Sequence, residues 1–266
     1  MIDKKQPIGI FDSGFGGLTV FKAIRKLMPG ENIIYFGDTA RVPYGTKSAE
    51  SVIEFSQQIS AYLMSRKIKI LVVACNTSSA LALDKLERSV KVPVIGVIGP
   101  SVNAVCSNTQ NKKILILATT STVKSRAYSK QLNKKNKKLL IHEKACPLFV
   151  PIIEEGCAGK TFAKQIVREY LLPLKKKKFD AMILGCTHYP MLKKVIKEVM
   201  GKRVSVINSS AQSALEVYEK LYGLKLLNKS KQGSEHFICS DDPKKFKTLA
   251  CTLLDIKIKK LSVKRF

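Results

Sequence analysis

Residues 180–190 read Asp-Ala-Met-Ile-Leu-Gly-Cys-Thr-His-Tyr-Pro. The apolar run 181–184, closed by a glycine, is typical of a buried strand, and a helical pattern begins near Pro190. This order places a thiol, a hydroxyl and an imidazole (Cys186, Thr187 and His188) at the carboxyl end of a strand. Open α/β sheets bind their ligands at that end of their strands. The stretch therefore predicts an α/β fold with a site next to Cys186.

A second stretch has the same design. The apolar run 70–74 ends in Cys75-Asn76-Thr77-Ser78, and a helical pattern follows it. Each cysteine thus stands between a strand and a helix, beside small polar residues whose backbone N–H groups can receive an anion. A single cysteine in such a place is most often a buried, inert small hydrophobe. Two in matching places favour a pair in which one thiol acts as base and the other as acid at a carbon centre.

A glycine-rich turn follows the first strand pattern of the chain. The apolar run 7–11 leads into Asp12-Ser13-Gly14-Phe15-Gly16-Gly17, and a helical pattern starts at Leu18. These glycines match neither the dinucleotide-binding fingerprint nor the P-loop, and Asp12 would repel a phosphate. An acid at this place suits an ammonium group, with Ser13 donating to a carboxylate. The alternative is that Asp12 only caps the turn or the helix.

The chain repeats this design in its second half. The strand pattern 113–117 leads into a hydroxyl-rich turn at Thr119, which precedes Cys186 by 67 residues, much as Asp12 precedes Cys75 by 63. The sequence therefore predicts two pseudo-symmetric α/β lobes with mainly parallel sheets. The two lobes, facing each other, would place one cysteine on either side of a cleft that holds the active site.

Further strand and helix patterns fill the rest of the chain. We expect strands at 32–36, 92–98, 139–142, 204–208 and 236–240, and helices at 18–27, 51–66, 76–89, 123–137, 161–172, 209–221 and from 243 onward. Residues 99–101 are expected to change the direction of the chain. The paired acids Glu154 and Glu155 are expected at a helix start, where they complement the helix dipole.

The composition excludes several classes of protein. The chain has 266 residues, 45% of them apolar, which suits one large or two smaller globular domains. Seven cysteines without a C-x-x-C pair, together with three histidines, argue against a disulfide framework and against a metal site. No signal-peptide pattern or membrane-length apolar run is present, so we expect a soluble cytoplasmic protein with no membrane partner.

The net charge of +27 comes mainly from lysines, which cluster at 134–138, 175–178, 244–245 and 259–260. Nucleic-acid readers favour arginine for base contacts and aromatic residues for stacking, and aromatics are sparse here. A solvated lysine-rich surface is one interpretation, and weak, salt-sensitive binding of polyanions is the other. In both cases the positive field would attract an anionic small substrate.

Four stretches together resemble the bacterial glutamate racemases, of the cofactor-independent aspartate/glutamate racemase superfamily. They are Ile10-Phe-Asp-Ser-Gly-Phe-Gly-Gly-Leu18, Asp38-Thr-Ala-Arg-Val-Pro-Tyr-Gly45, Ala74-Cys-Asn-Thr-Ser78 and Gly185-Cys-Thr-His-Tyr-Pro190. The resemblance implies racemisation of glutamate without cofactor or metal, supplying D-glutamate for peptidoglycan, in a homodimer. It also implies a first lobe of 1–97 plus 208–266 and a second lobe of 98–207.

The resemblance further assigns roles to single residues. Cys75 and Cys186 would stand on opposite faces of the α-carbon of glutamate, with Cys75 serving the D-enantiomer and Cys186 the L-enantiomer. Asp12, His188 and Glu154, the last in preference to Glu155, match positions proposed to assist the thiols. The positions that match substrate contacts are Asp12, Ser13, Tyr44, Gly45, Asn76, Thr77, Thr187 and His188.

Two other functions stay open on the sequence alone. One is a related racemase that acts on aspartate or another amino acid. The other is a basic protein that binds nucleic acid or an acidic partner through its lysines, for which Cys75 and Cys186 would not be needed.

Overall fold

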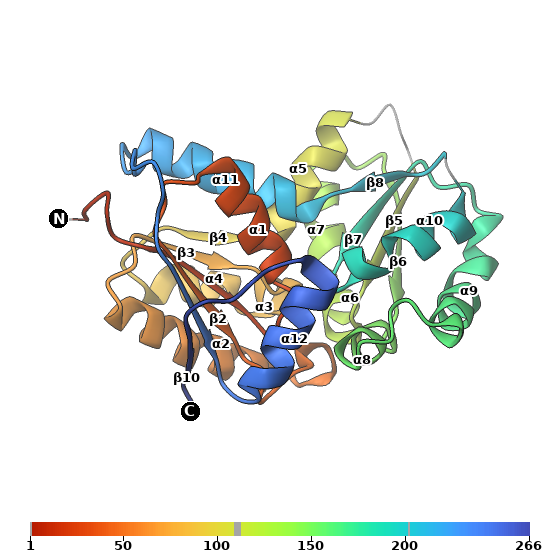
Figure 1. Cartoon of the computed structure of the whole chain (residues 1–266). Coiled ribbons are helices and arrows are strands. Elements are labelled where there is room, and N and C mark those ends of the chain that lie inside the picture. Colours follow the sequence, from red (N-terminus) through yellow and green to blue (C-terminus); the bar gives the residue numbers. More distant parts are fainter. Residues whose placement is uncertain (1, 109–112, 202) are drawn as a thin grey trace.

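The computed structural model describes residues 2–108, 113–201 and 203–266, and these form two lobes, each built on a parallel sheet (Figure 1). Sheet A has the strand order β10-β9-β2-β1-β3-β4, and sheet B has the order β6-β5-β7-β8. The strands of sheet A are β1 Ile8–Asp12, β2 Ile33–Gly37, β3 Ile70–Val73, β4 Val94–Gly96, β9 Glu235–Cys239 and β10 Leu261–Val263. Those of sheet B are β5 Lys113–Ala118, β6 Leu140–Ala145, β7 Ala181–Gly185 and β8 Ser205–Ile207. The predicted fold class is confirmed.

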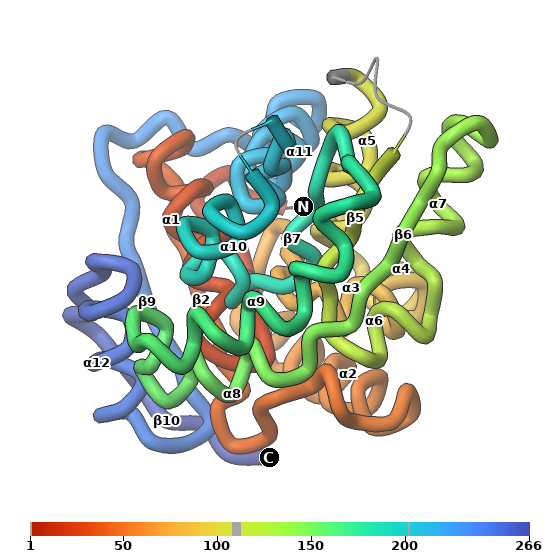
Figure 2. The backbone as a smooth tube through the Cα atoms, turned by 90° about the vertical axis from the view of Figure 1, so that its right-hand side faces the viewer, coloured from red at the N-terminus to blue at the C-terminus, as the bar shows by residue number. Residues whose placement is uncertain are grey.

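Helices connect the strands and cover the sheets. Those of the first lobe are α1 Leu18–Leu27, α2 Ala49–Ser65, α3 Asn76–Leu81, α4 Leu83–Ser89, α11 Ser209–Gly223 and α12 Pro243–Leu254. The others are α5 Ile98–Asn108, α6 Thr120–Ser125, α7 Ala127–Lys135, α8 Phe149–Glu154, α9 Thr161–Lys175 and α10 Lys193–Met200, and η1 Tyr44–Thr46 and η2 Tyr189–Leu192 are single 3₁₀ turns. Helices α9 and α10 lie at the side of the second lobe that is away from sheet A (Figures 1 and 2).

The repeated sequence design is visible in the sheet topology. Strand β1 pairs with β3, the strand that precedes Cys75, and β5 pairs with β7, the strand that precedes Cys186. All these pairings are parallel, so the carboxyl ends of paired strands meet at one edge of their sheet. Each lobe therefore brings its polar turn and its cysteine to the same edge.

Several expected elements differ from the structure. The expected helices 76–89 and 123–137 are each broken in two, the second at Arg126, whose left-handed backbone (φ 55°) ends α6. Residues 99–101 do not turn the chain; they belong to α5. The paired acids are not at a helix start, since Glu154 is the last residue of α8. Strand β10 was not expected, because its short run carries little apolar signal.

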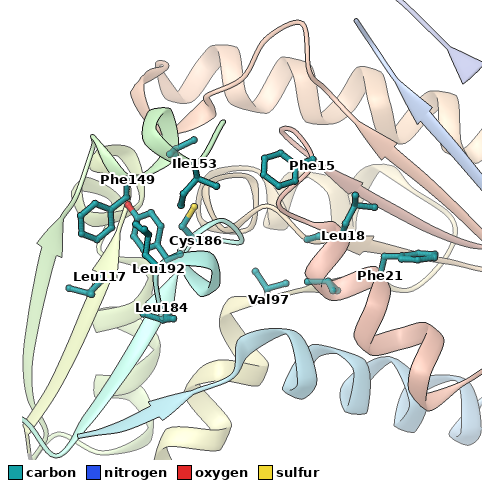
Figure 3. Packing of buried hydrophobic residues seen from close by; sticks show 14 of the residues in the cluster. Phe15, Leu18, Phe21, Val97, Leu117, Phe149, Ile153, Leu184, Cys186 and Leu192 are labelled. Carbon is teal, nitrogen blue, oxygen red and sulfur yellow. The ribbon is translucent and has the colours of Figure 1, made fainter. Parts of the chain in front are cut away.

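The two lobes share much of their interior. One hydrophobic cluster contains Phe15 and Leu18 of the first lobe together with Ile153 and Cys186 of the second (Figure 3). Helix α11 packs on α1 and also contacts α5. On this layout we propose the lobe boundaries that the resemblance implies, 1–97 plus 208–266 and 98–207.

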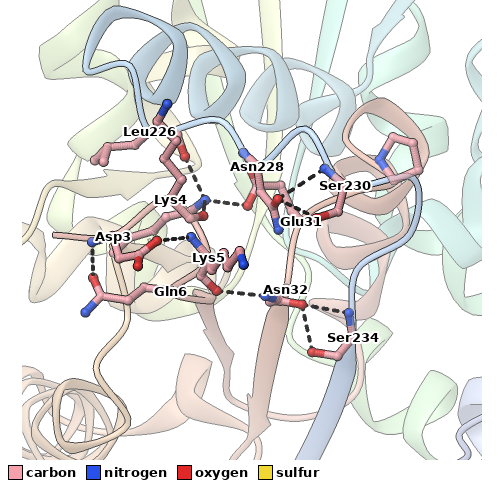
Figure 4. A network of polar contacts seen from close by, with 12 residues as sticks. Asp3, Lys4, Lys5, Gln6, Glu31, Asn32, Leu226, Asn228, Ser230 and Ser234 are labelled. Carbon is pink, nitrogen blue, oxygen red and sulfur yellow. Dashed lines mark hydrogen bonds and ion pairs between the residues drawn. The ribbon is translucent and has the colours of Figure 1, made fainter.

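A buried ion pair closes the end of sheet A that lies away from the polar turns. Lys69 Nζ lies 2.5 Å from Glu31 Oε2 and donates to the backbone carbonyls of Lys4, at 2.6 Å, and Leu226, at 2.8 Å. The other oxygen of Glu31 accepts a hydrogen bond from the backbone N–H of Asn228 (Figure 4). This network ties the first residues of the chain and the segment after α11 to the start of β3.

No helix among the described residues is both long and apolar enough to cross a membrane.

Candidate active site

The ends of four strands carry the polar residues of the site. Asp12 is the last residue of β1, and Cys75 caps α3, with its Sγ accepting a hydrogen bond from the Ser78 N–H at 3.5 Å. Thr119 caps α6 in the second lobe, and Cys186 follows β7 directly. Each lobe thus carries a thiol and an acid or hydroxyl at the ends of two paired strands.

Hydroxyl groups connect these strand ends across the lobes. Thr187 Oγ1 donates to Asp12 Oδ1 at 3.2 Å, and the hydroxyls of Thr77 and Thr119 lie 3.0 Å apart. The side-chain amide of Asn76 donates to the Tyr128 hydroxyl at 2.8 Å. The structure therefore brings the turns that follow all four strands into one polar layer between the sheets.

The glycine-rich turn is explained by close packing. A Cβ atom on Gly16 would lie 2.5 Å from His188 Nδ1 and 2.6 Å from Thr187 Oγ1, and one on Gly14 would lie 2.9 Å from Glu154 Oε1. Such distances leave no room for a side chain. The glycines therefore let the first lobe approach the turn after β7 in the second, a role that their spacing alone did not indicate.

Cys75 is 4% exposed, and its surroundings favour the neutral thiol. Burial and, to a lesser extent, the negative charge of Asp12 raise its pKa to about 11, against the hydrogen bonds of Ser78 and Ser13. Ser13 therefore acts on the thiol as well as lying at a predicted substrate position.

Cys186 is 7% exposed and has a different neighbour, the imidazole of His188. The Nδ1 of His188 lies 3.8 Å from Cys186 Sγ, and its Nε2 lies 2.7 Å from Glu154 Oε1. Burial lowers the pKa of His188, but the hydrogen bonds and negative charges of Cys186 and Glu154 outweigh burial and raise this pKa well above its ordinary value. Cys186 therefore has a cationic neighbour.

The structure distinguishes the two neighbouring acids. Glu154 contacts His188, whereas Glu155 points outward and forms an exposed ion pair with Lys245 at 2.9 Å. Glu154, the residue preferred from the resemblance, is the one next to the imidazole.

Asp12 both caps its turn and faces the other lobe. It is fully buried, and its Oδ2 accepts the Gly14 N–H at 3.1 Å. Burial raises the pKa of this carboxyl, while the charge of His188 and hydrogen bonds from Gly17, Gly14 and Thr187 oppose the rise. The capping alternative is thus part of the geometry, alongside the contact with Thr187.

Tyr44 and Gly45 lie at the same layer but differ in what they can offer a ligand. The phenol of Tyr44 is buried and donates to the carboxylate of Asp38, so its hydroxyl is already engaged within the first lobe. Gly45 packs directly against Thr119, and its carbonyl accepts a hydrogen bond from Ser121 at 3.0 Å.

Thr119 and Thr122 also belong to the polar layer, although the sequence did not single them out as site residues. Their hydroxyls lie 3.0 Å apart, and Thr122 lies 3.4 Å from Thr77. The available signal was the repeat, in which Thr119 occupies the place of Asp12.

Cavities adjoin this layer on two sides. One of about 60 Å³ is lined by Asn76 and Val97 of one part of the chain and by Cys186 and Thr187 of the other. A second, of about 180 Å³, lies between Phe15, Glu154 and helix α12. Within the described ranges, no three His, Cys, Asp or Glu side chains are grouped as ligands of a metal ion.

The arrangement is suited to moving a proton between carbon and sulfur. Two nearly buried thiols stand among hydroxyl, amide and backbone donors, which can stabilise a developing negative charge where water is scarce. The unequal surroundings of the thiols give one of them a cationic neighbour and the other an acidic one.

Known proteins share both the sequence and the fold of this chain. A profile of the Asp/Glu/hydantoin racemase family matches residues 15–215. The glutamate racemase of Geobacter metallireducens is 47% identical over 240 residues, which cover 90% of this chain and 89% of that protein. The crystal structure of glutamate racemase from Francisella tularensis in complex with D-glutamate has a TM-score of 0.92 and 37% identity, and covers 98% of both chains. The aspartate racemase of Picrophilus torridus, at 18% identity and a TM-score of 0.60 over 84% of this chain and 99% of that one, shares the fold alone.

Proposed function

The chain belongs to the Asp/Glu/hydantoin racemase family, and from this premise we propose that it is a glutamate racemase that uses two thiols and no cofactor. The observation that carries the proposal is the matching position of Cys75 and Cys186, each at the end of a strand that pairs with the leading strand of its lobe. The similarity to glutamate racemases, rather than to aspartate racemases, selects glutamate as the substrate.

In this mechanism one sulfur removes the α-proton as a thiolate, and the other delivers a proton to the opposite face of the carbon. Following the resemblance, Cys186 takes the proton of L-glutamate and Cys75 that of D-glutamate. The raised pKa of Cys75, to about 11, keeps a proton on that thiol, and the His188 imidazole lies 3.8 Å from the sulfur of Cys186. Both features suit the L-to-D direction, in which Cys186 is the base.

The polar layer supplies the groups that hold the substrate. We assign the ammonium group to Asp12 and the carboxylates to Ser13, Asn76, Thr77 and Thr187, which lie near the two thiols. Tyr44 and Gly45 contribute their backbone, since the Tyr44 phenol is bound to Asp38. The net charge of +27 attracts an anionic amino acid toward the surface.

The proposal has consequences for the cell. D-glutamate from this reaction would enter peptidoglycan, and the reaction would take place in the cytoplasm, where the seven free cysteines stay reduced. A homodimer is proposed from the resemblance alone.

The experiment that tests the proposal starts from L-glutamate and, separately, from D-glutamate in D₂O, with no cofactor added. Circular dichroism follows the loss of optical rotation, and proton NMR follows exchange at the α-carbon. We expect both enantiomers to reach the racemic mixture and to acquire α-deuterium. A folded protein that leaves both glutamates unchanged would contradict the proposal, and the same assay with aspartate would then identify the alternative substrate.

A further inference from the structure

The turn that carries Tyr44 and Gly45 is held in place by residues far away in the sequence. It belongs to the loop between β2 and α2, in which Arg41 donates its backbone N–H to the Asp38 carbonyl and Lys47 donates to that of Tyr44. The hydroxyl of Ser240, directly after β9, donates to Asp38 Oδ1 at 2.7 Å and accepts the Ala40 N–H at 2.8 Å. A hydroxyl has one proton to donate, so these two bonds use that proton and one of its acceptor positions.

Ser240 donates to a buried carboxylate, that of Asp38, and both oxygens of this carboxylate are hydrogen-bonded. Asp38 has no solvent exposure, and its other oxygen accepts from Arg41 Nε at 2.6 Å and from the Tyr44 phenol. Ser240 itself is 2% exposed, so water cannot replace its hydroxyl without a rearrangement. The orientation of Asp38, and with it the position of Tyr44, depends on the hydrogen bond from Ser240.

The position of Arg41 fixes the same carboxylate from the other side. The Arg41 guanidinium lies between the rings of Phe55, at 4.1 Å, and Phe266, at 5.2 Å, and donates to Gln58 at 2.6 Å. Arg41 therefore has little freedom to follow Asp38 if that side chain turns.

The far end of the turn touches the second lobe. The Ser121 hydroxyl lies 3.0 Å from the carbonyl oxygens of Gly45 and Lys47, and Gly45 packs on Thr119. A change at Ser240 therefore moves a turn that lies at the boundary with the polar layer of the active site.

We propose that Ser240 is a positioning residue for the substrate, acting through Asp38 and Ala40 on the Tyr44–Gly45 turn. The proposal rests on the proposed glutamate racemase function, because it takes that turn as part of the substrate site. It assigns a role in substrate binding to a residue from the C-terminal part of the chain, outside every stretch that carries the family resemblance.

The test compares Ser240→Ala with a control, Ser262→Ala. Ser262 lies on β10, which pairs with β9. Its hydroxyl forms one partly buried hydrogen bond, with His236 Nε2 at 2.8 Å. Ser240→Ala loses two buried hydrogen bonds and Ser262→Ala one that is partly buried, so Ser240→Ala should lose more stability toward urea. We expect Ser240→Ala to raise the KM for glutamate about tenfold with kcat changed less than about threefold, and Ser262→Ala to change neither.

A second readout does not depend on the reaction. Amide hydrogen exchange of residues 39–46 should become at least about tenfold faster in Ser240→Ala and stay unchanged in Ser262→Ala. If Ser240→Ala does not fold, Ser240→Cys replaces it, with a weaker donor and a smaller expected effect of the same sign. If the wild type does not racemise glutamate but residues 39–46 still exchange faster in Ser240→Ala, the racemase function is overturned and the role of Ser240 in positioning the turn is kept.

A double-mutant cycle with Tyr44→Phe tests the route through Asp38. If Ser240 acts on Tyr44 through that carboxylate, the double variant raises KM by less than the product of the two single effects. Unchanged KM and unchanged exchange in Ser240→Ala, or equal changes in Ser262→Ala, would overturn the proposal.

Discussion

The Thr187 hydroxyl lies 3.2 Å from Asp12 Oδ1, and this hydrogen bond joins the turn after β7 to the end of β1. It links residues 175 positions apart, one from each lobe. The contact holds the turn after β7 against the end of β1, so the acid of the first lobe and the thiol turn of the second share a layer.

Removal of either thiol should abolish racemisation. Cys75→Ala and Cys186→Ala each leave a single acid or base, so we expect the rate to fall by at least about 10³-fold in both directions. The free energy of unfolding should change by no more than about 1 kcal/mol, since each change removes one small side-chain atom. Cys251→Ala, at an exposed position, is the control and should keep full activity. Substantial turnover in either variant would contradict the two-thiol mechanism.

The glycine turn offers a test of close approach. Gly16→Ala places a methyl group 2.5 Å from His188 Nδ1, so the imidazole must shift, and we expect a loss of activity of about 100-fold and of stability by about 1–3 kcal/mol. Gly159→Ala is the matched control, because no heavy atom lies within 4 Å of the added Cβ. Steady-state kinetics and urea unfolding measure the two effects. Equal results for the two variants would show that the contact at Gly16 is not needed.

The acid next to His188 sets the pH range of the site. Glu154→Gln removes one of the charges that raise the pKa of His188, so this pKa should fall, and the alkaline limb of kcat/KM should move to lower pH. Glu155→Gln, whose carboxylate meets Lys245 instead, should leave the pH profile unchanged. A profile that is identical in wild type and Glu154→Gln would separate Glu154 from the chemistry.

The same pair also affects stability. The pKa of His188 is raised in the folded protein, so its contribution to stability is complete below the ordinary histidine value of about 6.5 and is lost as pH rises through the folded value. In Glu154→Gln this loss should be smaller and complete at lower pH, because the folded pKa of His188 is lower. Urea unfolding at a series of pH values between 6 and 9, as a difference from wild type, measures it.

The buried pair of Glu31 and Lys69 should matter for stability and not for catalysis. Lys69→Met leaves Glu31 without its counter-ion and two carbonyls without a donor, so we expect a loss of about 3–5 kcal/mol. Lys245→Met breaks an exposed pair and should cost at most about 1 kcal/mol. Kinetic constants should stay near those of wild type in both, provided that the protein remains folded.

Much of the site could be predicted because its signals are local. Cys75 and Cys186 each follow an uninterrupted apolar run and precede a helix, and that pattern fixes their place at a strand end before any tertiary contact is known. The repeat between the halves predicted two parallel sheets for the same reason, since each half carries the full order of strand, polar turn, strand and cysteine.

The remainder depends on packing that no local pattern describes. The Tyr44 phenol meets Asp38 because Ser240 and Arg41 hold that carboxylate, and these partners come from distant elements. The partners of Lys69 likewise could not be predicted from a lysine-rich sequence. They are Glu31 and the carbonyl of Leu226 in the segment after α11, which are brought to Lys69 by the fold. The acids at 154 and 155 look alike in sequence and differ only through their neighbours in space.

The two lobes repeat one topology but carry different residue types at one pair of equivalent places, and this difference can orient a bound molecule. At equivalent places in the two lobes, β1 ends in Asp12 and α6 is capped by Thr119. In the proposed function, an acid on one side and a hydroxyl on the other would distinguish the ammonium group of the substrate from its carboxylate. The two enantiomers of an amino acid can then bind with their three non-hydrogen substituents in the same positions. They differ only in which sulfur the α-hydrogen faces.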